Sequence, residues 1–333
     1  MAFRRCFLLI LTLTFFGSTA LASKKDAEAA ALIAHAKQLS DIRAEGAPPF
    51  RLKLNFKVIN EDGSVSEGAH TEDWVSRTQW RMETVLGDFR RTLVVVGRKR
   101  WLLESTTAEP EQLGSFLGLT NLGRFRPEAW KPEKVEDREL NGLSVRCIEV
   151  KPKPWGGKSA LCFDKIDGTV TAQVTPFQAG TRIGEAVCIY ADYQRFGNRV
   201  LARSYECDKD SHPVLKARVV ELVAAPPTDP TFFIPPDGAK ESVNCLSIVK
   251  APRAIYSPEP RIARNSVGPT VVMIRVVVGT DGKPHDLRTT SASNRDLDGV
   301  ALEAVRQWRF KPATCEGESV EGVVEVDVDF QVR

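Results

Sequence analysis

VEGVVEVDVDFQVR (residues 320–333), the C-terminal stretch of the chain, has a period of two. Its even-numbered residues are apolar or glycine: Val320, Gly322, Val324, Val326, Val328, Phe330 and Val332. Its odd-numbered residues include four acids: Glu321, Glu325, Asp327 and Asp329. Because successive side chains of a strand point to opposite faces, the pattern predicts a strand with one apolar and one acidic face. Such a strand either pairs wholly within its own chain or lies at a sheet edge and offers its backbone to another protein.

The segments before this strand complete a small β-β-α-β unit. Residues 270–293 indicate two strands around an Asp281-Gly282 turn. Residues 294–310 predict a helix, because apolar residues recur on one helical face: Leu297, Val300, Ala301, Ala304, Val305 and Trp308. The helix must cover the apolar face of the three-stranded sheet, with Trp308 at the centre of that core.

A Pro-rich segment separates this unit from a longer region. Residues 224–240, AAPPTDPTFFIPPDGAK, carry five prolines, which cannot continue a helix or a central strand. We therefore predict a domain boundary at the end of this segment. The N-terminal domain then covers residues 23–240 and the C-terminal domain residues 241–333.

The N-terminal domain is predicted to be a helix followed by many strands. The helix spans residues 24–43, and residues 50–60, FRLKLNFKVIN, alternate between apolar and polar side chains. Further strand-like runs are separated by Asn-Gly, Asp-Gly and Gly-Asn turns. We expect a curved antiparallel sheet or half-barrel with helices, so that the whole chain belongs to the α+β class. Such a sheet either packs its concave face solidly or encloses an apolar cavity for a ligand.

The cysteines indicate disulfides. Seven are present, and six remain once Cys6 of the N-terminal segment is set aside. Cys188 and Cys207 are equidistant from a Gly-Asn turn, and Cys147 and Cys162 are symmetric about a Pro/Gly turn, so each pair would lie opposite across a hairpin. Cys245 and Cys315 pair by elimination, and buried free thiols are the alternative. No C-x-x-C spacing points to redox chemistry or zinc.

The first residues predict export. Arg4 and Arg5 precede an apolar run, and small residues ending in Ala20-Leu21-Ala22 follow, which is typical of a signal peptide over residues 1–22. We expect the mature chain in the periplasm or cell envelope, and the alternative is an uncleaved N-terminus that anchors it in the inner membrane. Removing the two arginines lowers Lys+Arg from 46 to 44, against 43 Asp+Glu. This near-neutral balance does not suggest a nucleic-acid partner.

Motifs for catalysis or metal binding are absent from the sequence. The four histidines are scattered and lack the HExxH spacing of a zinc protease. Neither a G-x-S-x-G elbow nor a phosphate-binding glycine loop occurs. We therefore expect no catalytic residues, no metal site and no cofactor, and we expect that the protein is not an enzyme.

The C-terminal domain resembles the TonB C-terminal domain family. The likeness begins in APRAIYSPEPRIAR (251–264) and continues through VVVGTDGKPHDLRTTSAS, LDGVALEAVRQWRFKPA and GESVEGVVEVDVDF in the order of the family. The residues that carry the family motif are Tyr256, Pro258, Ala263, Arg264, Asp281, Gly282, Trp308, Phe310 and Pro312. The resemblance covers residues 250–332 approximately.

The resemblance implies a module of the bacterial envelope that takes part in transmembrane transport. In that family the domain binds an extended segment of an outer-membrane transporter at its sheet edge. The expected partner-binding residues of the edge strand are Val324, Val326, Val328, Phe330 and Val332. The alternatives are that the acids keep the edge soluble, or that the edge forms a homodimer. A full transducer has an uncleaved anchor and a long Pro-rich spacer, so a passive binding or adaptor role is expected here.

The N-terminal domain is similar to the periplasmic lipoprotein-carrier fold typified by LolA. The leading helix, the hairpin YADYQRFGNRVLARSYEC (190–207) and the closing PTDPTFFIPP (227–236) carry this likeness. Because the half-barrel of that family holds acyl chains, the resemblance implies a lipid or lipoprotein ligand. The alternative function is therefore a periplasmic lipid or lipoprotein carrier.

Overall fold

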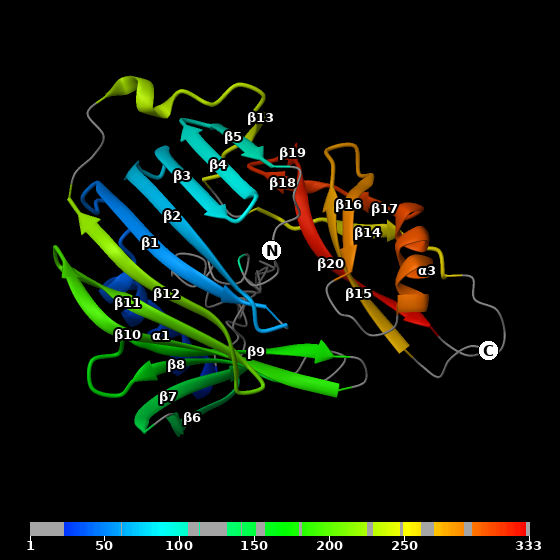
Figure 1. The fold of residues 1–333 in the computed structure, drawn as a ribbon. Coiled ribbons are helices and arrows are strands. Elements are labelled where there is room, and N and C mark those ends of the chain that lie inside the picture. Colours follow the sequence, from blue (N-terminus) through cyan, green and yellow to red (C-terminus); the bar gives the residue numbers. More distant parts are fainter. Residues whose placement is uncertain are drawn as a thin grey trace, which may run out of the picture.

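The computed structural model describes residues 23–60, 62–105, 113, 132–140, 142–150, 157–179, 182–224, 229–246, 249–260, 270–289 and 295–330. Its largest feature is a 13-stranded sheet (Figure 1). The predicted signal peptide (1–22) lies outside the described residues, and so do Ala263, Arg264 and Val332.

The large sheet is antiparallel at every pairing. Its strand order is β13-β5-β4-β3-β2-β1-β12-β11-β10-β9-β8-β7-β6, so β1 and β12 join two meanders. The strands are β1 (Phe50–Ile59), β2 (Val65–Ser76), β3 (Gln79–Leu86), β4 (Phe89–Val96), β5 (Lys99–Glu104), β6 (Pro132–Leu140), β7 (Leu143–Val150), β8 (Ser159–Asp164), β9 (Val170–Ala179), β10 (Arg182–Phe196), β11 (Arg199–Lys209), β12 (His212–Val223) and β13 (Lys240–Val243).

The predicted α+β class is wrong, because the chain is mostly β. The described α-helices are α1 (Lys24–Ser40) and α3 (Arg295–Arg306), of 17 and 12 residues, and Leu113 is also helical. The α+β prediction gave a few helices the same weight as many strands. In the structure each helix only covers part of one sheet face, while inter-strand pairing organises the rest of the chain.

Helix α1 covers one face of the large sheet, which we call the inner face. The Ser23 hydroxyl accepts a hydrogen bond from the Asp26 N–H at 3.3 Å, which caps the start of the helix. Buried Ala29 and Ile33 pack in one core with the apolar side of β1. The helix ends at Ser40, earlier than predicted, where the Asp41 N–H donates to the Lys37 carbonyl. The opposite, more polar face is called the outer face.

A polar group is buried within the inner face. Arg43 forms an ion pair with Glu72, and its Nε lies 2.7 Å from the Glu72 carboxylate. The guanidinium also lies over the Phe50 ring, 5.6 Å from its centroid. Next to it, His70 Nδ1 is hydrogen-bonded to Thr84 Oγ1 at 2.8 Å. The polar side chains are satisfied by one another, which is the condition for burying them.

We expect His70 to make stability depend on pH. Burial, the largest cause, lowers the pKa of His70 from 6.5 to about 4. Between these values the unfolded chain binds the proton more readily than the folded chain, so stability is complete above about pH 6.5 and is lost as the pH falls towards 4. A shift of this size corresponds to about 3 kcal/mol. Urea unfolding at pH 6.5 and at pH 4.5 should therefore show that the free energy of unfolding falls less in His70→Gln than in the wild type. An equal fall in both proteins would show that His70 is not the group responsible.

The three predicted disulfides are confirmed. Cys147 bonds to Cys162 across β7 and β8, and Cys188 bonds to Cys207 across β10 and β11. In both pairs the two cysteines are direct cross-strand partners, as the symmetric turn positions predict. Cys245 bonds to Cys315 and ties the segment after β13 to the C-terminal domain.

The described part of the Pro-rich segment packs on the large sheet. Its 3-10 turn η2 (Pro230–Phe233) packs on β3 and β4, and Phe233 is buried. Arg81 donates to the Phe232 carbonyl at 3.1 Å and its guanidinium lies over the Phe232 ring. After it, β13 pairs with β5 and becomes the last strand of the large sheet. The predicted boundary at residue 240 therefore coincides with the first residue of a strand in this sheet.

The C-terminal domain is built from short sheets and α3. Its three-stranded sheet has the order β16-β15-β20, and two ribbons accompany it, β14-β17 and β18-β19. The strands are β14 (Arg253–Tyr256), β15 (Thr270–Val278), β16 (Pro284–Thr289), β17 (Arg309–Lys311), β18 (Ala313–Cys315), β19 (Glu318–Val320) and β20 (Gly322–Phe330). Helix α3 packs on β15 and β16 (Figure 1).

Candidate functional site

Strand β20 is the last strand of its sheet in the part of the chain that the structure describes. It pairs with β15 from Thr270 opposite Phe330 to Val278 opposite Gly322, without a register shift. The alternating stretch thus forms an edge strand, but its first residue belongs to β19. Glu321 separates the two strands, and at Gly322, the first residue of β20, a Cβ would lie 2.5 Å from the Ala313 Cβ.

The predicted partner-binding side chains point into the domain's own core. Val328 and Phe330 are 1% and 2% exposed, and Val324 and Val326 are partly buried against the same cluster under α3. Val332 lies outside the described residues. These side chains therefore hold β20 in place. A partner strand would meet the backbone of β20.

The β15–β16 hairpin indicates which backbone groups of β20 point outwards. Gly279 N–H donates to the Lys283 carbonyl at 3.0 Å, so the backbone of Gly279 faces β16. Backbone direction alternates along a strand, so Val278, Val276 and Ile274 face β20. Their partners on β20 are the even-numbered residues, which use their N–H and C=O groups inside the sheet. The odd-numbered residues, among them Glu325 and Asp329, direct theirs away from β15.

These outward-facing residues are the part of the site that sequence reasoning missed. The period of two separates the faces of a strand, but it does not show which residues bond to which neighbour. The feature that could have identified them is the turn at residues 279–282, because it fixes which residues of β15 face β16 and which face β20. There Asp281 accepts a hydrogen bond from the Lys283 N–H at 3.0 Å, and this bond is the main cause that lowers the Asp281 pKa.

The motif turn Asp281-Gly282 contacts the segment that follows α3. Gly282 has a φ of +76°, and its carbonyl accepts the Phe310 N–H at 2.9 Å. A Cβ at Gly282 would lie 2.2 Å from the Phe310 carbonyl oxygen and 3.8 Å from Pro312 Cδ. Only glycine allows this close approach, so the structure brings these motif residues together.

A second motif group surrounds Trp308. The indole Nε1 donates to the Pro258 carbonyl at 3.2 Å, and the ring lies 6.1 Å from that of Phe310. The predicted helix 294–310 ends earlier, at Arg306, so Trp308 follows the helix and Phe310 lies in β17. Tyr256, in contrast, is 59% exposed.

Ion pairs join the C-terminal domain to the large sheet. Glu321, just before β20, forms an ion pair with Lys240 of β13, whose Nζ lies 3.0 Å from the carboxylate, and His285 Nε2 of the C-terminal domain lies 3.2 Å from the same carboxylate. Arg98, from the β4–β5 hairpin, contacts Glu316 at 2.9 Å. These groups are largely exposed, so each pair contributes little stability. They set the charge around the start of β20.

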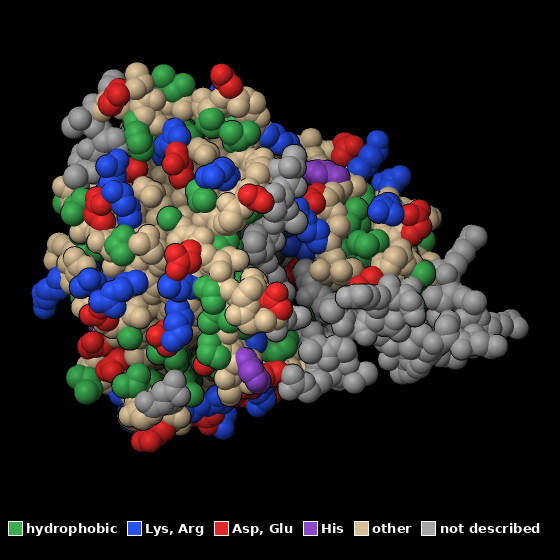
Figure 2. All heavy atoms as spheres, in the orientation of Figure 1, with side chains coloured by type: hydrophobic (Ala, Val, Ile, Leu, Met, Phe, Trp, Pro, Cys, Tyr) green, Lys and Arg blue, Asp and Glu red, His purple; other side chains and the backbone are tan. Residues whose placement is uncertain are grey.

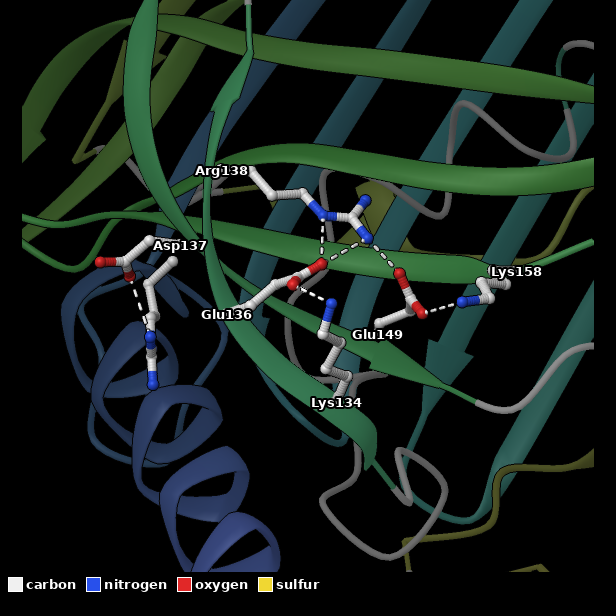
Figure 3. A network of polar contacts seen from close by, with 7 residues as sticks. Lys134, Glu136, Asp137, Arg138, Glu149 and Lys158 are labelled. Atoms are coloured by element: carbon white, nitrogen blue, oxygen red, sulfur yellow. Dashed lines mark hydrogen bonds and ion pairs between the residues drawn. The ribbon is translucent and has the colours of Figure 1, made fainter.

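At the other edge of the large sheet, opposite β13, the terminal strand β6 carries ion pairs. On the terminal strand β6, Arg138 bonds to both Glu136 and Glu149, and Lys158 approaches Glu149 at 2.5 Å (Figure 3). Asp137, on the other face of β6, pairs with Arg146 at 2.9 Å. Charged pairs on both faces of an edge strand oppose the addition of another strand.

One depression lies on the described part of the large sheet. A depression of about 730 Å³ on the outer face involves β1, β2, β11 and β12, and its rim includes the ion pair Lys57–Glu67. Among the described residues, no group of three or more His, Cys, Asp or Glu is placed to hold a metal ion. Neither is any described helix long and apolar enough to cross a bilayer.

Comparison with known proteins finds relatives of the C-terminal domain. Residues 260–332 match the family described as Gram-negative bacterial TonB protein C-terminal. The chain is 33% identical over 79 residues to Protein tonB2 of Pseudomonas aeruginosa, a match that covers 23% of this chain and 29% of that protein. It is 35% identical over 75 residues to Protein TonB of Xanthomonas campestris pv. campestris, covering 22% of this chain and 33% of that protein. The match thus spans a third or less of each relative, and it confirms the predicted resemblance of this domain.

The solved structures found by comparison are more distant in sequence. A putative outer membrane lipoprotein-sorting protein domain from Vibrio parahaemolyticus has a TM-score of 0.42 at 15% identity, covering 62% of this chain and 97% of that chain. A LolA superfamily protein from Nitrosomonas europaea has a TM-score of 0.40 at 9% identity, covering 61% and 96%. These values are too low to assign a function to the large sheet, and its lipid ligand stays a prediction.

Proposed function

We propose that this chain is an exported protein of the bacterial cell envelope that binds a partner and performs no catalysis. Its C-terminal domain recruits an extended segment of an outer-membrane or other envelope protein, which adds to β20 as a further strand. The observation that carries this proposal is the position of β20 at the end of its sheet, with the odd-numbered backbone groups directed away from β15.

Of the terminal strands of the 13-stranded and three-stranded sheets, β20 is the one best suited to strand addition. β13 has four residues, and β6 carries the ion pairs of Figure 3. β16 begins with Pro284, which has no N–H, and a bulge accompanies the φ of +46° at Asp286. β20 has nine residues in a regular register.

The two faces of β20 select the incoming strand. Its helix-side face is apolar, whereas Glu325 and Asp329 are exposed on the other face. Because like charges directly opposite each other destabilise a sheet, an added strand should carry basic or neutral residues on the acidic side. Backbone bonds would supply the affinity, and this charge rule would supply selectivity.

A proline substitution tests strand addition. Glu325→Pro removes an N–H that points away from β15, so the domain should fold while a partner strand loses a backbone hydrogen bond. We expect at least ~10-fold weaker capture of envelope proteins from solubilised membranes by the mature protein, since a lost bond to a buried group costs about 1–3 kcal/mol.

The matched control is Glu325→Ala, which removes the same side chain but keeps the N–H. Capture by Glu325→Ala should stay near the wild-type level. Equal loss in both variants would assign the effect to the carboxylate and refute strand addition. A dimer in the wild type that becomes a monomer in Glu325→Pro, with no envelope protein captured, would show that the edge pairs with a second copy.

A further inference from the structure

The ribbon of β14 and β17 presents one exposed face. Arg253 lies opposite Lys311 and Tyr256 opposite Arg309 in an antiparallel register. The side towards the domain core is apolar, since Phe310 is 3% exposed and belongs to the cluster under α3. The other side carries the cations Arg253, Arg309 and Lys311, all of them exposed. We call this exposed side the β14–β17 surface.

A β-bulge adds two apolar side chains to this surface. The register shifts between Ala254 and Tyr256, so two residues of β14 lie against one residue of β17. Bulges re-aim side chains. Here Ile255 and Tyr256 are 63% and 59% exposed, directly beside the three cations. A soluble ribbon has no structural need for two large apolar side chains on its solvent side.

Two like charges face each other on this surface. Arg253 and Lys311 are direct cross-strand partners, and like charges in this position destabilise a sheet. In the described part of the chain, no carboxylate forms an ion pair with these two residues or with Arg309, although Arg306 nearby is paired with Glu303 at 2.8 Å. The surface therefore has excess positive charge in a chain that is otherwise nearly balanced.

We propose that the β14–β17 surface binds the anionic headgroup layer of a lipid bilayer. Phosphates of neighbouring lipids would neutralise Arg253 and Lys311, while Ile255 and Tyr256 enter the interface between headgroups and acyl chains. Basic residues around exposed aliphatic and tyrosine side chains are typical of proteins that lie on membranes. Figure 2 shows one face of the molecule, on which acidic and basic side chains are interspersed over the large sheet.

The inference is independent of strand addition at β20. The surface belongs to a different ribbon and uses side chains, whereas the edge of β20 uses backbone groups. Membrane binding would hold β20 close to a partner embedded in the same membrane. Each property can fail without the other, because Glu325 is not part of the surface.

Vesicle sedimentation tests this proposal. The mature full chain should bind vesicles of phosphatidylethanolamine with phosphatidylglycerol and should not bind phosphatidylcholine vesicles, both measured at low salt. The double variant Arg253→Glu/Lys311→Glu should lose at least ~10-fold in partition, because each cation near an anionic surface is worth several-fold. Binding should also fall as salt rises from low to physiological ionic strength. Arg309 is left unchanged, since its guanidinium donates to the Trp308 carbonyl at 2.7 Å after α3.

Matched variants separate this surface from general effects. Arg90→Glu/Arg195→Glu reverses two exposed arginines on the large sheet and should leave binding within about twofold, because distant charges are screened. Ile255→Ser/Tyr256→Ser should weaken binding, whereas Ile166→Ser, at a residue that is 97% exposed, should not. Melting curves of all variants confirm that they are folded.

Each outcome decides the proposal. No binding of the wild type to anionic vesicles, or equal binding by Arg253→Glu/Lys311→Glu, overturns it. The proposal is also overturned if Arg90→Glu/Arg195→Glu loses as much binding as Arg253→Glu/Lys311→Glu. A polyglutamate peptide that binds the surface when vesicles do not would assign it to an acidic protein.

Discussion

Replacing Trp308 with alanine should lower the free energy of unfolding of the C-terminal domain by about 3–5 kcal/mol, as expected for truncation of a buried tryptophan. The side chain is 8% exposed and packs in one cluster with the apolar face of β15 and with Val328 of β20. The substitution also leaves the Pro258 carbonyl without the indole donor at 3.2 Å. Urea unfolding followed by near-ultraviolet circular dichroism measures this loss.

Two further variants make the result specific. Trp308→Phe keeps most of the apolar volume and removes the Nε1 donor, so we expect a smaller loss of about 1–2 kcal/mol. Trp101→Ala, at a half-buried position of β5 in the large sheet, should leave the C-terminal transition unchanged. A Trp308→Ala protein as stable as the wild type would refute the packing described here.

Removing the Cys245–Cys315 disulfide should destabilise the protein more than removing either hairpin disulfide. Its loop spans 70 residues, against 15 for Cys147–Cys162, and the chain-entropy relation assigns about 4 kcal/mol to the longer loop and about 3 kcal/mol to the shorter. The exposed ion pairs that also join the C-terminal domain to the large sheet, such as Arg98–Glu316, cannot replace this bond.

The comparison uses paired serine variants under identical conditions. Cys245→Ser/Cys315→Ser should show the larger shift of the urea midpoint, and limited proteolysis should cut first near the segment that follows β13. Cys147→Ser/Cys162→Ser is the control, because its cysteines lie in two strands already paired in the sheet. A larger loss in the control pair would contradict the loop argument.

Local patterns predicted the elements whose geometry depends on near neighbours in sequence. The Asp281-Gly282 turn, the opposed cysteines of the two hairpins and the alternating residues of β20 are all as expected. The end of α3 was missed because Trp308 continues the helical spacing. In the structure the chain leaves the helix there, so that Phe310 can bond to Gly282.

The candidate site was predicted only in part. The alternation identified the strand and its two faces, and the TonB likeness indicated the mode of binding. The sequence did not show which residues direct their backbone outwards, because that depends on the register with β15. Nor did it show that Arg253 and Lys311 lie opposite each other, since their strands are far apart in the chain.

The sequence by itself determined most strands, the turns, the two hairpin disulfides and the resemblance of the C-terminal domain, because turn geometry and side-chain periodicity are local properties. Tertiary structure alone decided that thirteen strands form one sheet, that β13 extends it, and that β20 ends another. It also buried His70 beside Thr84. These features follow from pairing between segments that are distant in sequence. The free energy of such pairing depends on the register and burial of the whole fold and cannot be inferred from a short segment.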